Sequence, residues 1–307
     1  MLILYNKSQE ISIKFEEFVN NKLVKGELIM ELLWEIVQFA FYSGLIVLIS
    51  KYILVRTLRS LAENLNLKPK TVGDIAGVAT SVPELLTIGA ASINGLLGAS
   101  IYNVLSSNMI NLIQYSGAIA LNKNQNAIKN KAIKIDIVLV LITIIIPIFF
   151  SILKSEFQLA MVPVFIILYW GFKKINNNVH KLYLPIDEEL EDSATKKSSN
   201  KFKLFRDIVI LIITGIFLFV IGDWLGNTLE VLCGRFNVPE LVVGIVLGFI
   251  TSIPELITFF EAQRHHKKAE NEMLGVVEAT NNLLMSNMMN LFVIQSIGIL
   301  LFQFFGS

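Results

Sequence analysis

Two glutamates lie in the middle of otherwise apolar stretches, and each directly follows a proline in a nearly identical string. Residues 80–87 read TSVPELLT, and residues 251–258 read TSIPELIT. A carboxylate at the centre of an apolar membrane segment is costly unless it faces a partner or an aqueous cavity. Glu84 and Glu255 are therefore candidate functional groups.

Further oxygen atoms accompany each carboxylate. A proline removes one backbone N–H and leaves the carbonyl one turn earlier without its helical donor, here at Ala79 and Ile250. Freed carbonyls, serine or threonine hydroxyls and a carboxylate within one turn form a site of hard oxygen ligands. Such ligands suit Na⁺, Ca²⁺ or Mg²⁺ rather than a soft metal.

A second string is also repeated, as NVLSSNMINL at 103–112 and NLLMSNMMNL at 282–291. In the first copy, Ser107 and Asn111 stand four residues apart and share one helix face. Taken singly, a Pro-Glu kink or a serine on a membrane helix more often serves packing than binding. Both strings occur in the same order in both halves of the chain, which favours one central cavity lined by carboxylates, amides and hydroxyls.

The composition is that of a polytopic membrane protein. Of 307 residues, 54% are hydrophobic and 17% are charged, against about 25% charged residues in soluble domains. The run IDIVLVLITIIIPIFFSIL at 135–153 matches the roughly 20 residues that cross a bilayer as a helix. The single cysteine excludes an intramolecular disulfide. We predict an all-α fold, and the absence of a nucleotide-binding loop or nucleophile–base pair argues against an enzyme.

Apolar windows predict about eight transmembrane helices, at 33–55, 71–95, 97–121, 134–153, 157–173, 206–232, 240–262 and 274–305. A polar cytoplasmic linker, 174–205, divides them into a first repeat of five spans (33–173) and a second of three (206–305). The connections on the linker's side carry twenty Lys and Arg residues, and the opposite side carries six. The positive-inside rule then predicts that both termini lie outside.

In this topology the segment with Glu84 runs outward and the segment with Glu255 runs inward, so the two repeats are inverted. Inverted repeats are typical of secondary transporters, whose substrates bind where the two halves meet.

The first 32 residues form a polar segment without the features of a signal peptide. The codons of Lys25-Gly26-Glu27 can read AAAGGAGAA, which resembles a bacterial ribosome-binding site ahead of Met30. We hypothesise that translation starts at Met30. The alternative is a genuine extramembrane tail.

On these strings the sequence resembles the cation/calcium exchanger superfamily, which includes the sodium/calcium exchangers. Its signatures are similar to G-T-S-x-P-E and G-N-x-x-G-S-N-x-x-N, each present once per inverted half. The resemblance implies alternating access for Ca²⁺ and for Na⁺ or H⁺, without a cofactor. It also implies ten cation ligands: Glu84, Glu255, the carbonyls of Thr80 and Thr251, and the side chains of Ser81, Ser252, Ser107, Ser286, Asn111 and Asn290.

The chain departs from the family pattern at several positions. Ala79 and Ile250 replace the glycine before Thr-Ser, and Ser106 and Met285 replace the glycine before Ser-Asn. Bulk there is expected to narrow the cavity or to restrict helix approach. Asn290 stands where sodium/calcium exchangers commonly carry an aspartate. The resembled family usually has about ten spans, five in each inverted repeat, and eight are predicted here. Either a second copy or a partner protein supplies two helices, or the second half is held together differently, or the chain is truncated.

We therefore expect a cation antiporter of the plasma membrane that exchanges Ca²⁺ for Na⁺ or H⁺ at a two-glutamate site. Its expected partners are the lipid bilayer and inorganic cations, and no nucleic acid. The alternative is a non-transporting sensor or scaffold that binds a cation without moving it. His265 and His266 lie in a charged connection and are expected to be solvated. Glu278 is a further acidic residue in a span, but the internal repeat does not support a functional role for it, because its counterpart is Ala99.

Overall fold

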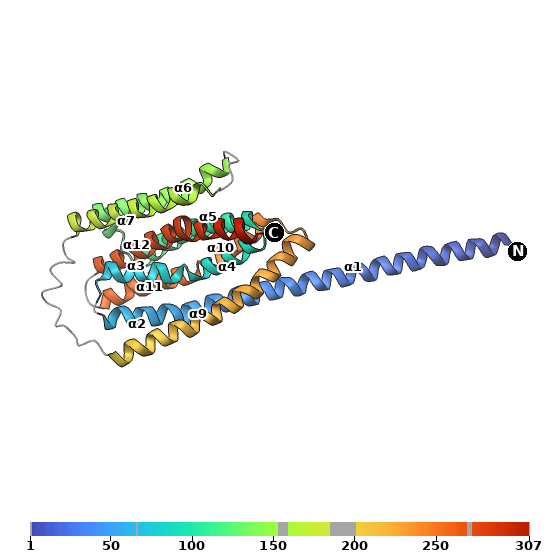
Figure 1. Ribbon diagram of the computed structural model, residues 1–307, viewed down its shortest axis with the longest axis horizontal. Coiled ribbons are helices and arrows are strands. Elements are labelled where there is room, and N and C mark those ends of the chain that lie inside the picture. The colour runs from blue at the N-terminus through green and yellow to red at the C-terminus, as the bar shows by residue number, and fades with distance from the viewer. Residues whose placement is uncertain (1, 66, 153–158, 185–200, 269–271, 307) are drawn as a thin grey trace.

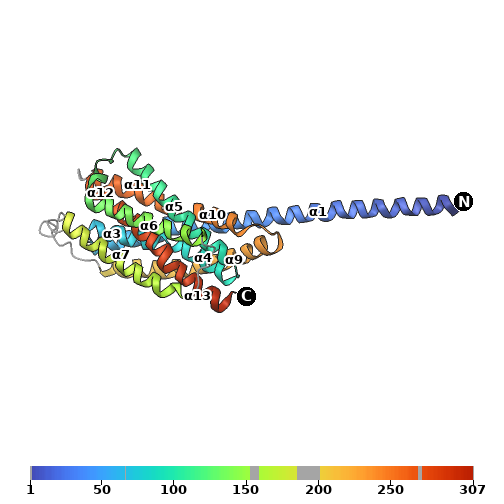
Figure 2. The same ribbon diagram turned by 90° about the horizontal axis from the view of Figure 1, so that it is seen from above.

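The computed structural model describes the whole chain except residues 1, 66, 153–158, 185–200, 269–271 and 307. The described residues form helices and turns without a strand, as predicted for an all-α membrane protein. Most helices run along one common axis, and α1 extends far beyond the bundle (Figure 1, Figure 2).

The helices of the first half are α1 (Leu2–Ile49), η1 (Ser50–Val55), α2 (Arg56–Asn64), α3 (Pro69–Thr80), α4 (Val82–Ile93), α5 (Leu97–Leu121), η2 (Ala127–Lys129), α6 (Lys131–Ile152) and α7 (Met161–Tyr183). Those of the second half are α9 (Lys201–Glu230), η3 (Val231–Arg235), α10 (Glu240–Thr251), α11 (Ile253–Lys268), α12 (Glu272–Met288), η4 (Met289–Ile294) and α13 (Gln295–Phe305). Segments η1, η3 and η4 are π-helical continuations, and η2 is a 3₁₀ turn.

Six helical segments of the described chain are long and apolar enough to cross a membrane: Gly26–Leu61, Pro69–Ile93, Lys131–Phe149, Lys201–Arg235, Glu240–Lys267 and Glu272–Phe305. They match six of the eight predicted spans. The other two predicted spans are α5 and α7, which are 25 and 23 residues long. Either could cross a core of about 30 Å. Buried serines and asparagines make α5 less apolar than the six segments above. The last ten residues of α7 are mostly polar, which lowers the hydropathy of that helix.

The predicted start of the polar linker at residue 174 is wrong, because α7 continues to Tyr183. Asn176 and His180, in this extension, are 2% and 3% exposed and bind the buried carboxylate of Asp136 on α6. These contacts hold the last turns of α7 against the bundle. Residues 185–200 of the linker lie outside the described residues.

Helix α1 begins at Leu2 and passes without interruption through Met30. The predicted polar segment 1–32 is therefore helical where it is described. Whether translation starts at Met30 stays a prediction.

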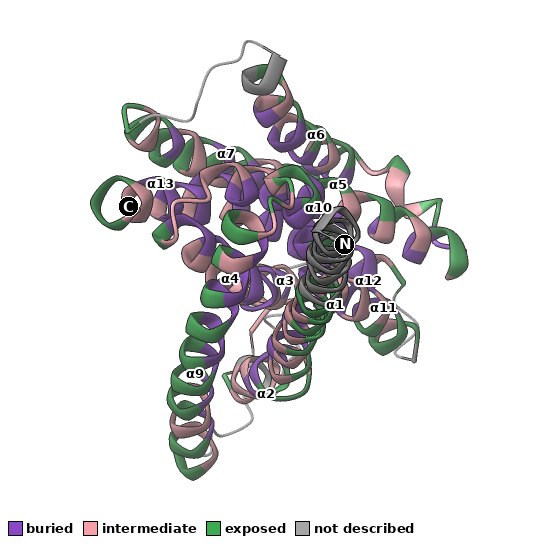
Figure 3. Cartoon of the chain, turned by 90° about the vertical axis from the view of Figure 1, so that its right-hand side faces the viewer, coloured by how far each residue is buried: buried purple, intermediate pink, exposed green. Residues whose placement is uncertain are grey.

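The bundle has a buried centre and two peripheral long helices. Only 22% of the most apolar window of α1 and 28% of that of α9 are buried, against 61% for α3–α4. An end-on view shows the buried residues gathered around α3, α10 and α12, with exposed residues along α9 (Figure 3). Helices α6 and α7 lie on one side of the bundle and α2 and α9 on the opposite side (Figure 1).

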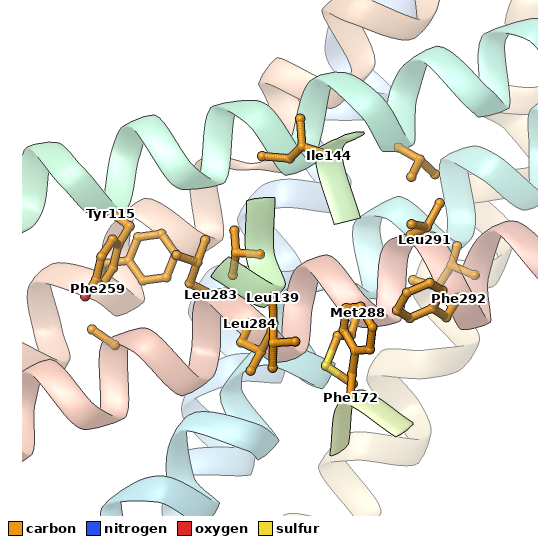
Figure 4. Close-up of a cluster of buried hydrophobic side chains, with 14 of the residues drawn as sticks. Tyr115, Leu139, Ile144, Phe172, Phe259, Leu283, Leu284, Met288, Leu291 and Phe292 are labelled. Atoms are coloured by element: carbon orange, nitrogen blue, oxygen red, sulfur yellow. The ribbon is translucent and has the colours of Figure 1, made fainter. Parts of the chain in front are cut away.

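Two hydrophobic clusters flank the centre. One joins α5, α6, α7, α11 and α12, where Tyr115 packs edge-on against Phe259 and Phe172 against Phe292 (Figure 4). The other joins α1, α4, α9 and α10 around residues such as Ile46, Leu225 and Leu247. The polar residues of the two repeated strings lie on helices that also contribute to these clusters, and on α3.

Two glycine pairs let helices of opposite halves approach closely. Gly73 and Gly77 place α3 against α12, and Gly244 and Gly248 place α10 against α5. A Cβ at Gly77 would lie 2.7 Å from the carbonyl oxygen of Asn282, and a Cβ at Gly248 would lie 2.8 Å from that of Asn103. Small residues spaced four apart permit such backbone contact between membrane helices. The two contacts are equivalent under the internal repeat, which confirms the inverted architecture.

We expect Gly77→Val to lower the free energy of unfolding by about 1–3 kcal/mol, because the new side chain overpacks the contact between α3 and α12. Gly215 on α9 is the matched control, since a Cβ there meets no atom within 4 Å. Unfolding of the purified protein in detergent with increasing SDS, followed by circular dichroism, measures both variants. Equal losses in the two variants would contradict the packing role of Gly77.

Candidate cation site

Each Pro-Glu string interrupts a membrane-spanning helix. Helix α3 ends at Thr80 and α4 begins at Val82, with Ser81 between them at φ −81° and ψ 0°. In the second half, α10 ends at Thr251 and α11 begins at Ile253. Broken helices of this kind place backbone ends inside the membrane, where transporters commonly bind ions.

The break also explains where the glutamates lie. Glu84 and Glu255 each occupy the first turn of the helix that follows the break, where the helix dipole favours a negative charge. The prolines leave the carbonyls of Ala79 and Ile250 without a helical donor. The N–H groups of Ser81 and Ser252 donate to the carbonyls of Gly77 and Gly248, at 3.3 and 3.2 Å, and so complete the last turns of α3 and α10.

All ten predicted ligand residues are at most 1% exposed. Direct contacts link several of them across the two halves. Ser81 Oγ lies 3.1 Å from Ser286 Oγ, and Ser286 Oγ donates to Glu255 Oε1 at 3.0 Å. Ser252 Oγ donates to the carbonyl of Gly248 at 2.7 Å and lies 3.5 Å from the carbonyl of Ser107 in the other half. The hydroxyls of the two threonines donate instead to carbonyls of their own helices.

The crossing of α5 and α12 is held by a reciprocal network of amides. Asn108 Nδ2 donates to the carbonyl of Asn287, and Asn287 Nδ2 donates to the carbonyl of Asn108, both at 3.2 Å. Asn111 Nδ2 donates to Asn287 Oδ1, and Asn290 Nδ2 donates to Asn108 Oδ1, again at 3.2 Å. With their nitrogens held in this way, Asn111 and Asn290 have their side-chain oxygens left over.

A second pair of contacts repeats in both halves behind the glutamates. Thr87 Oγ1 accepts from Asn103 Nδ2 at 2.7 Å and donates to the carbonyl of Glu84 at 3.2 Å. In the other half, Thr258 Oγ1 accepts from Asn282 Nδ2 and donates to the carbonyl of Glu255 at 2.9 Å. Each threonine thus links the backbone of a glutamate to an asparagine whose oxygen remains unused.

The centre of the bundle consequently holds a set of buried oxygens that accept no hydrogen bond within the part of the chain that the structure describes. They are Glu84 Oε1 and Oε2, Glu255 Oε2, and the Oδ1 atoms of Asn103, Asn111, Asn282 and Asn290. Buried polar atoms in proteins nearly always have a partner, and an exception calls for an explanation such as an ion or a water. A set made of acceptors alone is complementary to a cation.

The two glutamates are not equivalent. Glu255 Oε1 accepts from Ser286, whereas neither oxygen of Glu84 has a donor in hydrogen-bonding geometry among the described residues. The equivalent serine, Ser107, donates to the carbonyl of Val104 at 3.2 Å instead. Both carboxyls carry an oxygen without a hydrogen-bond partner among the described residues, and a cation between them would be attracted to both.

The predicted narrowing of the cavity by bulky replacements is wrong. Ile250 is half-buried and packs at the edge of the cluster formed with α1 and α9. Met285 lies against α7, its Sδ 3.9 Å from Tyr169 Oη. Ser106 fits the contact with α10 and donates to the carbonyl of Gly244 at 3.2 Å. Asn290 makes two donations, to Ser107 and Asn108, that an ionised aspartate could not make.

Sequence reasoning left six polar residues of this centre out of the ligand set: Thr87, Thr258, Asn103, Asn282, Asn108 and Asn287. All six belong to the repeated strings. Repetition alone could have singled them out, but their roles depend on contacts between segments that are distant in sequence.

The expectation that both histidines of the α11 connection are solvated is wrong for one of them. His265 is exposed, but His266 Nε2 lies 2.9 Å from Glu278 Oε2, and the Glu278 side chain is only 6% exposed. Arg59 Nη2 contacts the other oxygen of Glu278 at 3.2 Å. Glu278, whose counterpart in the first half is Ala99, is thus the centre of an ionic cluster.

A family comparison agrees with this geometry. The model of the sodium/calcium exchanger protein family matches residues 35–173 and 207–304. The chain belongs to this family. It is 25% identical over 254 residues to a protein named "Putative antiporter CaxA" from Alkalimonas amylolytica, an alignment that covers 78% of this chain and 72% of that protein. The chain is therefore a multi-pass membrane transporter of the exchanger type rather than an enzyme.

Two solved structures share the fold. The crystal structure of the H⁺/Ca²⁺ exchanger CAX superposes with a TM-score of 0.62 at 13% identity, covering 89% of this chain and 68% of that chain. The sodium–calcium exchanger NCX_Mj, soaked with 10 mM Na⁺ and zero Ca²⁺, superposes with a TM-score of 0.50 at 20% identity, covering 88% and 83%. These likenesses support the inverted helical architecture.

We expect Thr87→Val and Thr258→Val each to weaken Ca²⁺ binding about 10-fold, because residues that orient the ligands of a metal typically contribute this much to affinity. Thr143→Val is the matched control, since Thr143 is buried in α6 and donates to the carbonyl of Val140 at 2.7 Å. Isothermal titration calorimetry on the purified protein in detergent gives the affinities. Unchanged Ca²⁺ affinity in both test variants would contradict the orienting role.

Proposed function

We propose that this protein is a secondary active antiporter that exchanges Ca²⁺ for Na⁺ or H⁺ by alternating access, with Glu84 and Glu255 at the centre of its cation site. The observation that carries the proposal is the set of buried oxygens without donors that the two inverted halves bring together. A bound cation would satisfy them.

The ligand chemistry favours a hard cation. Carboxylate, amide and hydroxyl oxygens are the ligands that Ca²⁺ and Na⁺ take in proteins. The buried carboxylates of Glu84 and Glu255 supply the charge of the proposed site. Amide oxygens of Asn111 and Asn290 complete it without adding charge.

The architecture supports alternating access. Among the six segments that are long and apolar enough to cross a membrane, those of α1 and α9 are the least buried, so these two helices can move against the centre at low cost in packing. The glycine contacts of α3 with α12 and of α10 with α5 form the more rigid part. We propose that α1 and α9 slide across this part and expose the site to each side in turn.

We further propose a location in the plasma membrane with both termini outside. The first and last helices extend toward the same end of the bundle (Figure 1). The opposite end, here called the basic end, carries α2, the end of α7, the start of α9 and the end of α11, where Lys and Arg are concentrated. The basic end then faces the cytoplasm.

We expect proteoliposomes that contain the protein to take up radiolabelled Ca²⁺ when an outward Na⁺ or H⁺ gradient is imposed. Glu84→Gln and Glu255→Gln should each abolish this uptake, because each removes one of the two buried charges. Glu230→Gln is the control, since Glu230 is exposed at the end of α9 and should leave uptake unchanged. Ca²⁺ binding without flux under either gradient would instead indicate a non-transporting sensor or scaffold.

Two carboxylates balance one Ca²⁺ or two monovalent cations, so we expect a cycle that moves no net charge. Uptake should change by less than about twofold between zero and −100 mV, whereas one moved charge corresponds to about 2.3 kcal/mol at that potential. Ca²⁺ uptake into liposomes clamped with K⁺ and valinomycin measures this dependence. A steep response to the potential would contradict the two-charge site.

A further inference from the structure

An ionic cluster lies at the basic end, outside the cation site. Arg59 on α2 contacts Glu278 on α12, with 3.2 Å between Nη2 and Oε1, and it approaches Glu261 on α11 with 3.6 Å between Nη1 and Oε2. His266 Nε2 lies 2.9 Å from the second oxygen of Glu278. Both oxygens of this nearly buried carboxylate are therefore engaged, one by each neighbouring helix.

The cluster joins the peripheral helices to the centre. Helix α2 continues α1 through η1, and Ser60 Oγ on α2 donates to Asp207 Oδ2 on α9 at 2.7 Å. The basic ends of the two long helices are thus tied to each other. Arg59 ties this pair to α11 and α12, so a sliding motion of α1 and α9 against the centre would strain or break its contact with Glu278.

Two residues of the cluster, Arg59 and Glu278, also line a narrow void that reaches Thr258. The void has a volume of about 10 Å³, and its lining includes Thr258 together with Arg59, Glu278 and Ala76. A void of this size holds no more than about one water. Thr258 bonds to Asn282 and to the backbone of Glu255. The void between the ion pair and Thr258 is therefore too small to admit a hydrated cation.

The inverted half has no equivalent of this ion pair. The residue related to Arg59 by the repeat is Glu230, and the residue related to Glu278 is Ala99. The backbone N–H of Ala99 donates instead to Glu240 Oε2 at 2.8 Å. An ion pair present in only one half can hold only one end of the transporter closed.

We propose that Arg59 and Glu278 form a latch that keeps the site closed toward the basic end and that must open for cations to pass there. This inference rests on the alternating access of the proposed function. Removing either partner breaks the contact between α2 and α12 in the closed state, which shifts the population toward the state that is open at the basic end.

The test measures access to the void rather than transport. Ala76→Cys is introduced in a Cys233→Ser background, which removes the native cysteine, and its rate of labelling by a charged methanethiosulfonate is followed by mass spectrometry in detergent. Arg59→Gln and Glu278→Gln should each speed labelling about fivefold or more, a typical size for conformational coupling. The two variants remove opposite partners of the same ion pair, so either variant alone tests the latch if the other does not fold.

Arg56→Gln is the matched control. Arg56 is on the same helix but is exposed and lies over the ring of Tyr52 at 5.1 Å, so its loss should leave the labelling rate unchanged. Equal labelling rates in the parent, Arg59→Gln and Glu278→Gln proteins would overturn the latch, as would an equal acceleration by Arg56→Gln. If liposomes show no Ca²⁺ flux while the latch variants still speed labelling, the proposed transport fails and the latch stands.

Discussion

The structure depends on one constraint: two carboxylates and several amides are buried at the centre of a bundle that must be apolar outside. A buried oxygen without a donor is unfavourable, yet seven such atoms gather where the two halves meet. The surrounding hydrogen bonds explain how this arises. Amide nitrogens are used by carbonyls and hydroxyls of neighbouring helices, which leaves the amide oxygens for a cation.

The rest of the architecture serves to bring these atoms together. Breaks at Ser81 and Ser252 divide two spans, so that Glu84 and Glu255 each lie in the first turn of a new helix. The glycine pairs then bring α3 and α12, and likewise α10 and α5, into backbone contact. Hydrophobic clusters pack on either side of these contacts. Most of the surface of the long helices α1 and α9 is exposed and available to lipid.

Departures from symmetry are as informative as the symmetry itself. Ser286 donates to Glu255, while Ser107 donates to a backbone carbonyl rather than to Glu84. The two carboxylates therefore differ in their hydrogen bonding. Glu278 and Arg59 form an ion pair that the other half lacks. Such differences set which closed state is favoured, because two identical inverted halves would populate both closed states equally.

The sequence by itself determined the membrane character, the inverted repeat and the ten central residues, because hydropathy and repeated strings are properties of the chain read locally. Only the tertiary structure decided what these residues contact. It extended α7 into the predicted linker through Asn176 and His180, moved Ile250 and Met285 from the cavity into packing contacts, and gave Glu278 its partners. Those outcomes depend on which faces of distant helices meet, and spacing along one helix cannot specify that.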